Sequence, residues 1–101
     1  MNQQQMMRQL QKMQADMARA QEELAAAEVT GTAGGDMVSA TMSGNGELRA
    51  VKINPQAVDP EDVELLEDMV VAAVAEAKKN ADALQQQLMG AATSGIKLPG
   101  F

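Results

Sequence analysis

The chain has 101 residues and a mass of 10.7 kDa, and its 14 acidic against eight basic residues give a net charge of −6. It contains no Cys, His, Trp or Tyr, and its single aromatic residue is Phe101. These absences exclude a zinc site of the usual kind, a disulfide framework, and catalysis that depends on His or Cys. They also exclude aromatic stacking on unpaired bases. The net charge alone makes nucleic acid an unfavourable partner.

Small side chains dominate the apolar residues, of which 18 are alanine and nine are methionine. A domain of this size with few large apolar side chains builds only a marginal core, so we expect either partial disorder or a core enlarged by association. The N-terminus does not resemble a signal peptide. The longest strongly apolar stretch, residues 69–75, is far shorter than the roughly 20 residues that span a bilayer. We therefore expect a cytoplasmic protein without a membrane partner.

Residues 1–28 predict a helical arm, because the segment is free of Gly and Pro from residue 3 onward and rich in good helix formers. Its apolar residues recur at alternating intervals of four and three: Met6, Leu10, Met13, Met17, Ala20, Leu24 and Ala27. This heptad pattern fits an amphipathic helix docked on its own sheet, or a helix that pairs with another chain. The narrow, methionine-rich stripe favours the second alternative. The residues expected at a dimer interface are Met6, Leu10, Met13 and Met17.

Residues 29–55 predict a three-stranded antiparallel meander. Turns are expected at residues 33–36 and at Gly44-Asn45-Gly46, and Pro55 should end the last strand. The middle strand places Val38, Ala40 and Met42 on one face. Strict alternation in the last strand would place Arg49, Val51 and Ile53 opposite Leu48, Ala50 and Lys52.

Residues 59–89 predict a second long helix, with Asp59 as N-cap, Pro60 at the first helical position and Gly90 as the stop. Its broad apolar stripe includes Leu66 and Val70, which we expect against the sheet and at the dimer interface. Residues 90–101 form a Pro/Gly tail. The sequence therefore predicts one α+β domain over residues 1–101, in the order helix, three strands, helix and tail.

The charges are segregated along the chain. Residues 1–20 carry +2 and residues 77–101 carry +2, whereas residues 59–76 carry −7. Helical spacing places Arg8, Lys12 and Arg19 on the face away from the apolar stripe, and Lys78 and Lys79 lie on the second helix. These basic residues form either an ordinary solvated surface or a strip that contacts DNA phosphates with little reading of sequence.

No arrangement of polar residues indicates catalysis or a cofactor. The acidic residues near position 60 suit the start of a helix, and their order does not match a calcium loop. The glycines do not form a phosphate-binding loop, because no Gly-Lys-Ser/Thr follows them. We expect no enzyme activity, no metal, no cofactor and no small-molecule substrate.

The whole chain resembles the YbaB/EbfC family of bacterial nucleoid-associated DNA-binding proteins. The carrying segments are the Met/Gln-rich start, Glu28-Val29-Thr30-Gly31, Gly44-Asn45-Gly46, Val51-Lys52-Ile53-Asn54-Pro55, Leu65-Leu66-Glu67-Asp68-Met69-Val70, and the closing Leu98-Pro99-Gly100-Phe101. The resemblance implies an α+β homodimer with a shared centre of sheets and second helices, from which helical arms project like tweezers. Carried onto this chain, it assigns contact with double-stranded DNA to Arg8, Lys12, Arg19, Lys78 and Lys79. Relatives often carry more basic residues in the first helix.

Two hypotheses of function follow. The leading one is a non-enzymatic, homodimeric DNA-binding protein of the nucleoid that affects nucleoid organisation and gene expression. The alternative is a protein-interaction module, or an accessory factor of a recombination or repair complex, which the acidic net charge favours.

Overall fold

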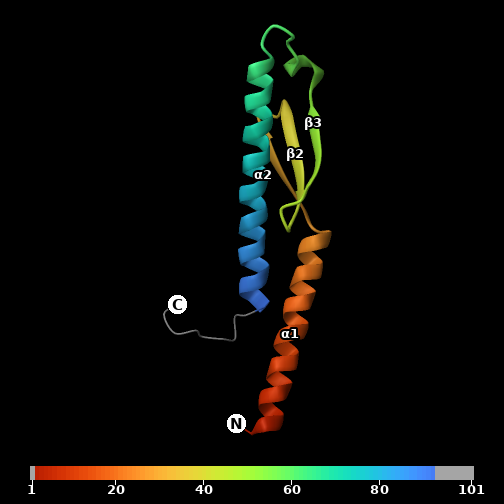
Figure 1. The fold of residues 1–101 in the computed structure, drawn as a ribbon, viewed down its shortest axis with the longest axis vertical. Coiled ribbons are helices and arrows are strands. Elements are labelled where there is room, and N and C mark those ends of the chain that lie inside the picture. Colours follow the sequence, from red (N-terminus) through yellow and green to blue (C-terminus); the bar gives the residue numbers. More distant parts are fainter. Residues whose placement is uncertain (1, 93–101) are drawn as a thin grey trace, which may run out of the picture.

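The computed structural model describes residues 2–92, which form two long helices and a small sheet (Figure 1). The elements in chain order are α1 (Gln3–Ala26), β1 (Glu28–Ala33), β2 (Val38–Ser43), β3 (Leu48–Ile53), the short 3-10 helix η1 (Pro55–Ala57) and α2 (Val63–Ala92). The strands form one antiparallel sheet in the order β1-β2-β3. The predicted α+β fold is confirmed, and most of the predicted tail lies outside the described residues.

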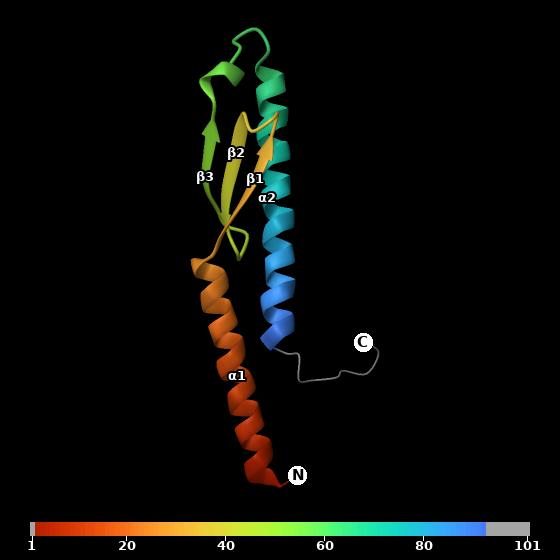
Figure 2. The same ribbon diagram turned by 180° about the vertical axis from the view of Figure 1, so that it is seen from behind.

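Helix α1 is capped at its start and buried only toward its end. The Asn2 side chain accepts a hydrogen bond from the Gln5 amide at 2.8 Å, and the Gln5 side chain accepts one from the Asn2 amide at 3.3 Å. Residues 2–12 are all exposed, whereas Ala20 and Leu24 are buried. The second half of α1 packs against α2, and its first half projects beyond the rest of the molecule (Figures 1 and 2).

The first turn of the meander uses the left-handed backbone region three times in succession. Gly34, Gly35 and Asp36 have φ angles of 64°, 64° and 69°, which glycine adopts at little cost. The next strand, β2, alternates as predicted, with Val38, Ala40 and Met42 buried on the face toward α2.

Strand β3 departs from the predicted alternation because the pairing of β2 with β3 is irregular between Thr41 and Met42. Ala40 pairs with Val51, as strict alternation requires, but Met42 pairs with Leu48. Directly opposed residues share a face, so the shift moves Leu48 to the core side of the sheet, where the sequence placed Arg49.

Helix α2 begins at Val63, four residues after the predicted N-cap Asp59. The Asp59 side chain instead accepts a hydrogen bond from the Glu61 amide at 3.0 Å, which stabilises a separate turn before the helix. Asp62 takes the capping role, because its side chain accepts from the Leu65 amide at 3.3 Å. At the other end, Gly90 does not stop the helix, which continues to Ala92.

The core is built from small residues. Ala73, Ala77 and Ala81, spaced by four, are fully buried on the side of α2 that faces the sheet, where they meet the apolar side chains of β2. Side chains of α2 also cover the outer edge of β1: Asn80 donates to the Thr30 carbonyl at 2.8 Å, and Glu76 accepts from the Thr32 amide at 3.3 Å. One edge of the sheet is therefore closed.

Candidate nucleic-acid interface

Of the three residues of α1 that are predicted to contact DNA, Arg8 and Lys12 lie on its exposed, projecting part, and Arg19 follows farther along the helix. Arg8 and Lys12 are exposed, and within residues 2–92 neither forms an ion pair. Arg19 is 3.9 Å from Asp16, but its side chain is 70% exposed, so this pair holds it weakly. Helical spacing places all three on one side of α1, opposite Met6 and Leu10.

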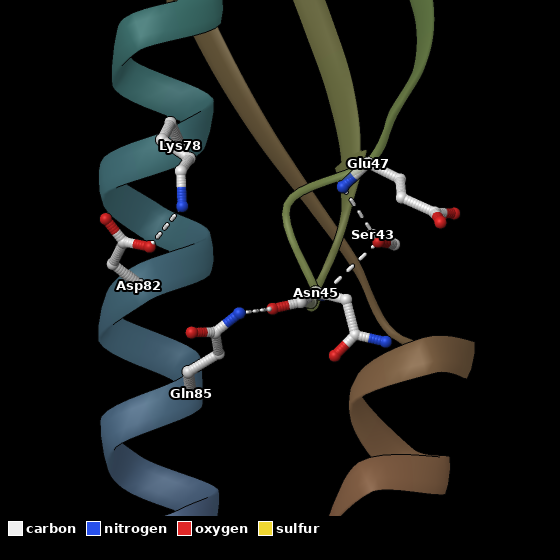
Figure 3. Close-up of polar contacts among 7 residues, drawn as sticks. Ser43, Asn45, Glu47, Lys78, Asp82 and Gln85 are labelled. Atoms are coloured by element: carbon white, nitrogen blue, oxygen red, sulfur yellow. Dashed lines mark hydrogen bonds and ion pairs between the residues drawn. The ribbon is translucent and has the colours of Figure 1, made fainter.

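The two lysines predicted on the second helix have different surroundings. The Lys78 ammonium is 2.7 Å from the Asp82 carboxylate, and its side chain lies beside the β2–β3 turn (Figure 3). Its charge is therefore partly compensated. Lys79 is exposed and forms no ion pair within the described part of the chain. Both lysines belong to the part of α2 that covers the sheet, and the free end of α1 projects away from this part (Figures 1 and 2). The five predicted residues therefore do not form one compact cluster.

Two further basic residues occur on β3. Arg49 donates to the Ala25 carbonyl at 2.6 Å and lies 3.7 Å from Glu28, so it joins the sheet to the end of α1. Lys52 is exposed and pairs across the sheet with Ser39, on the face away from α2. The alternation of polar and apolar residues in β3 placed Lys52 on this outer face, but nothing in the sequence indicated the contact of Arg49 with α1.

The charges are segregated in space as well as in sequence. The chain extends over 71 Å in its longest dimension. The second half of α1 lies beside the C-terminal part of α2, and both helices extend toward the same end of the molecule, whereas the acidic start of α2 lies at the other end (Figure 1). The basic arm therefore projects away from the acidic residues near position 60, an arrangement that the net charge of −6 conceals.

Within residues 2–92, no group of acidic side chains could hold a metal ion. Of the acidic residues near position 60, Asp59 and Asp62 accept hydrogen bonds from backbone amides. None of the helices in the described part of the chain is both long and apolar enough to cross a bilayer.

The residues predicted at a dimer interface fall into two groups. Met6 and Leu10 are about half exposed on the projecting arm, and Met13 and Met17, farther along α1, are partly buried. Leu66 and Val70 pack against the core of their own chain. The other large apolar residues that are exposed in the described part of the chain are Met7, Leu48, Ile53, Val58, Val63, Leu65 and Val71.

Comparison with known proteins places these features in a family. A "Nucleoid-associated protein" of Streptomyces avermitilis is 60% identical over 95 residues, covering 94% of this chain and 84% of the relative. One of Roseiflexus sp. is 48% identical over the full length of both chains. The crystal structure of the uncharacterized protein HP0035 from Helicobacter pylori superposes with a TM-score of 0.74 at 25% identity, covering 87% of this chain and 92% of that one. Residues 1–96 match the YbaB/EbfC DNA-binding family, and the chain belongs to this family.

Proposed function

We propose that this protein is a non-enzymatic, nucleoid-associated protein that binds duplex DNA as a homodimer and thereby affects nucleoid organisation and gene expression. The observation that carries the proposal is the position of Arg8, Lys12 and Arg19 on the exposed side of a helix that projects away from the acidic part of the molecule. Membership of a DNA-binding family, and relatives named nucleoid-associated proteins, support it.

The arm suits contact with the DNA backbone. Guanidinium and ammonium groups bind phosphate oxygens. Such contacts position a protein on the duplex without reading the base sequence of the DNA. Lys79 offers a further exposed cation, and Lys78 offers less because Asp82 is already its partner. The chain lacks aromatic side chains that could stack on unpaired bases within residues 1–100, so duplex DNA is the favoured ligand.

A salt series tests this proposal directly. If two arms contribute about six phosphate contacts, the affinity for duplex DNA should fall roughly a thousandfold between 50 and 200 mM salt. Fluorescence anisotropy with a random-sequence duplex measures this slope, and a second duplex of different sequence should give a similar one. Undetectable binding at the lowest salt concentration, by a protein that remains folded and dimeric, would exclude the proposed function.

An apolar surface beside β3, exposed in the described part of the chain, supports the homodimer. Helix α2 packs over β1 and β2, so that Leu48 and Ile53 of β3 remain half exposed on the same side of the sheet. Val71, which is 68% exposed, lies two helical turns before Lys78 and therefore on the β3 side of α2. A second copy of the chain placed here would cover these residues and the open edge of β3, and would enlarge a core made of small side chains.

The dimer proposal predicts that Val71→Glu produces monomers. A carboxylate buried at the interface would be desolvated without a partner, and should raise the dimer dissociation constant about a hundredfold. Light scattering at micromolar concentration measures the mass against the 10.7 kDa of one chain. Leu65→Glu is the matched control, because Leu65 is exposed on the opposite flank of α2. Equal loss of dimer in both variants would contradict this placement of the interface.

The other candidate function, an accessory role in a recombination or repair complex, has one specific observation in its favour. Exposed Val63 and Leu65 lie among acidic residues at the end of the molecule opposite the basic arm. Charge reversal of Arg8, Lys12 and Arg19 separates the two candidates. Under the DNA-binding proposal this change abolishes function while a protein partner is still retained in pull-down, whereas an accessory role predicts that function survives.

A further inference from the structure

A small set of hydrogen bonds connects the end of α1 to the rest of the molecule. We call the residues that form them, Gly44, Arg49 and Gln85, the arm joint. The last carbonyl groups of a helix have no partner within the helix. Here the Gly44 amide donates to the Leu24 carbonyl at 2.9 Å and to the Ala27 carbonyl at 3.3 Å. Arg49 donates to the Ala25 carbonyl at 2.6 Å, which also places a cation at the negative end of the helix dipole.

The same joint reaches α2. The Gln85 side-chain amide donates to the Gly44 carbonyl at 2.9 Å, so one residue of the β2–β3 turn accepts from α2 and donates to α1 (Figure 3). Gly44 is buried, and a Cβ atom there would lie 2.6 Å from the Leu24 carbonyl oxygen and 2.9 Å from Leu24 Cδ2. Because there is no room for a side chain, only glycine lets the turn approach α1 this closely.

The turn that carries Gly44 is itself held in one shape. Ser43 is 1% exposed, and its hydroxyl oxygen accepts from the Asn45 amide at 3.2 Å and from the Glu47 amide at 3.1 Å. The Gly46 amide donates to the Ser43 carbonyl at 3.0 Å. The joint is therefore anchored to a fixed turn, and α1 cannot rotate without breaking at least one of these contacts.

We propose that the arm joint sets the angle of α1, and that Gly44 and Gln85 are thereby positioning residues for DNA contact. The inference rests on the proposed function, in which the α1 arm binds DNA. Arg8 lies sixteen residues before Leu24, which is about 24 Å along a helix. A tilt of roughly 10° at the joint would displace Arg8 by roughly 4 Å, comparable to the 3.4 Å between successive phosphates along the axis of one DNA strand.

The test measures arm angle and DNA affinity on the same variants of the full chain. Gln85→Glu keeps the size of the side chain but replaces the donor with an oxygen that faces the Gly44 carbonyl. Gln86→Glu is the matched control. It introduces the same negative charge one residue away, at an exposed position. Gly44→Ala is the more disruptive variant, and circular dichroism establishes that each protein is folded.

Spin labels report the angle of the arm independently of DNA. The chain has no native cysteine, so Gln9→Cys and Ala75→Cys, both at exposed positions, label the arm and α2 selectively. Mixing with excess unlabelled protein leaves at most one labelled chain in any dimer. We expect one narrow distance in the parent protein and in the Gln86→Glu control, and a distance shifted by several ångström or broadened in Gln85→Glu and Gly44→Ala.

We expect Gln85→Glu to weaken DNA binding about tenfold relative to Gln86→Glu, although the basic residues of α1 are unchanged. An unchanged spin-label distance in the joint variants would overturn the proposal. A shifted distance with the same DNA affinity as the control would also overturn it, because the angle would then not matter for binding. If the parent protein binds no DNA, the proposed function fails, and the distance measurement still decides whether the joint fixes the arm.

Discussion

Replacing Arg8, Lys12 and Arg19 together by glutamine is expected to weaken binding to duplex DNA about a hundredfold near 0.1 M salt. Each phosphate contact releases bound counterions from DNA, so losing three contacts per arm removes most of the electrostatic free energy of binding. Glutamine has a helix propensity close to that of arginine and lysine, so the arm should stay helical. The side chains are exposed, and their loss should leave the core unchanged.

Anisotropy titrations at several salt concentrations measure both the affinity and its salt dependence. The triple variant should show a shallower slope of log affinity against log salt, because fewer counterions are released. Lys52→Gln removes one exposed charge from the outer face of the sheet and is the control for Arg8→Gln. We expect the control to change the affinity less than about twofold. Equal effects of Lys52→Gln and Arg8→Gln, or an unchanged slope in the triple variant, would contradict the assignment to the arm.

The parts of the fold that the sequence predicted depend on local periodicity and on the residue types that favour turns. The alternation along β2 predicted that Val38, Ala40 and Met42 share one face, and all three residues are buried on it. The Gly44-Asn45-Gly46 turn was predicted because glycine and asparagine favour tight turns, and β2 and β3 flank it. These features follow from residues close to one another in the chain.

The features that the sequence did not predict depend on contacts between distant segments. The irregular pairing that moves Leu48 to the core side arises where β2 and β3 meet, and no residue type marks it. Gly90 was expected to stop α2, but helical structure tolerates an isolated glycine at modest cost. Asp59 was expected to cap α2, but a side chain that can accept from a backbone amide also stabilises a turn.

The candidate site shows the same division. The basic side of α1 was predictable because the heptad stripe determines which side of the helix faces away from the apolar contacts. The role of Arg49 was not, because its hydrogen bond to Ala25 spans 24 residues of sequence. Leu66 and Val70 were expected against the sheet and at a dimer interface. They pack on the core of their own chain, and their contact with a second chain stays a prediction, because an apolar stripe on a helix does not distinguish the two kinds of contact.

Gly31→Val is expected to lower the free energy of unfolding by about 3 kcal/mol or more, the largest loss of stability that we expect from a single substitution. Gly31 lies on β1 where the strand crosses α2, and a Cβ atom there would collide with the Ala77 backbone nitrogen and the Ala73 carbonyl oxygen. Backbone atoms of a helix cannot move aside singly, so α2 would have to separate from the sheet. Separation would open the core between β2 and the buried alanines of α2.

Urea denaturation followed by circular dichroism measures this loss. All variants are compared at one protein concentration, because the apparent stability of a protein that dimerises depends on concentration. Thr30→Val is the matched control, since it introduces the same side chain at the preceding, exposed position of β1 and should change stability by no more than about 0.5 kcal/mol. An unchanged urea midpoint for Gly31→Val would show that α2 does not approach β1 this closely. A loss confined to Gly31→Val would show that the close approach of the backbones of β1 and α2 stabilises the fold. This close packing would offset the small size of the alanine side chains of α2.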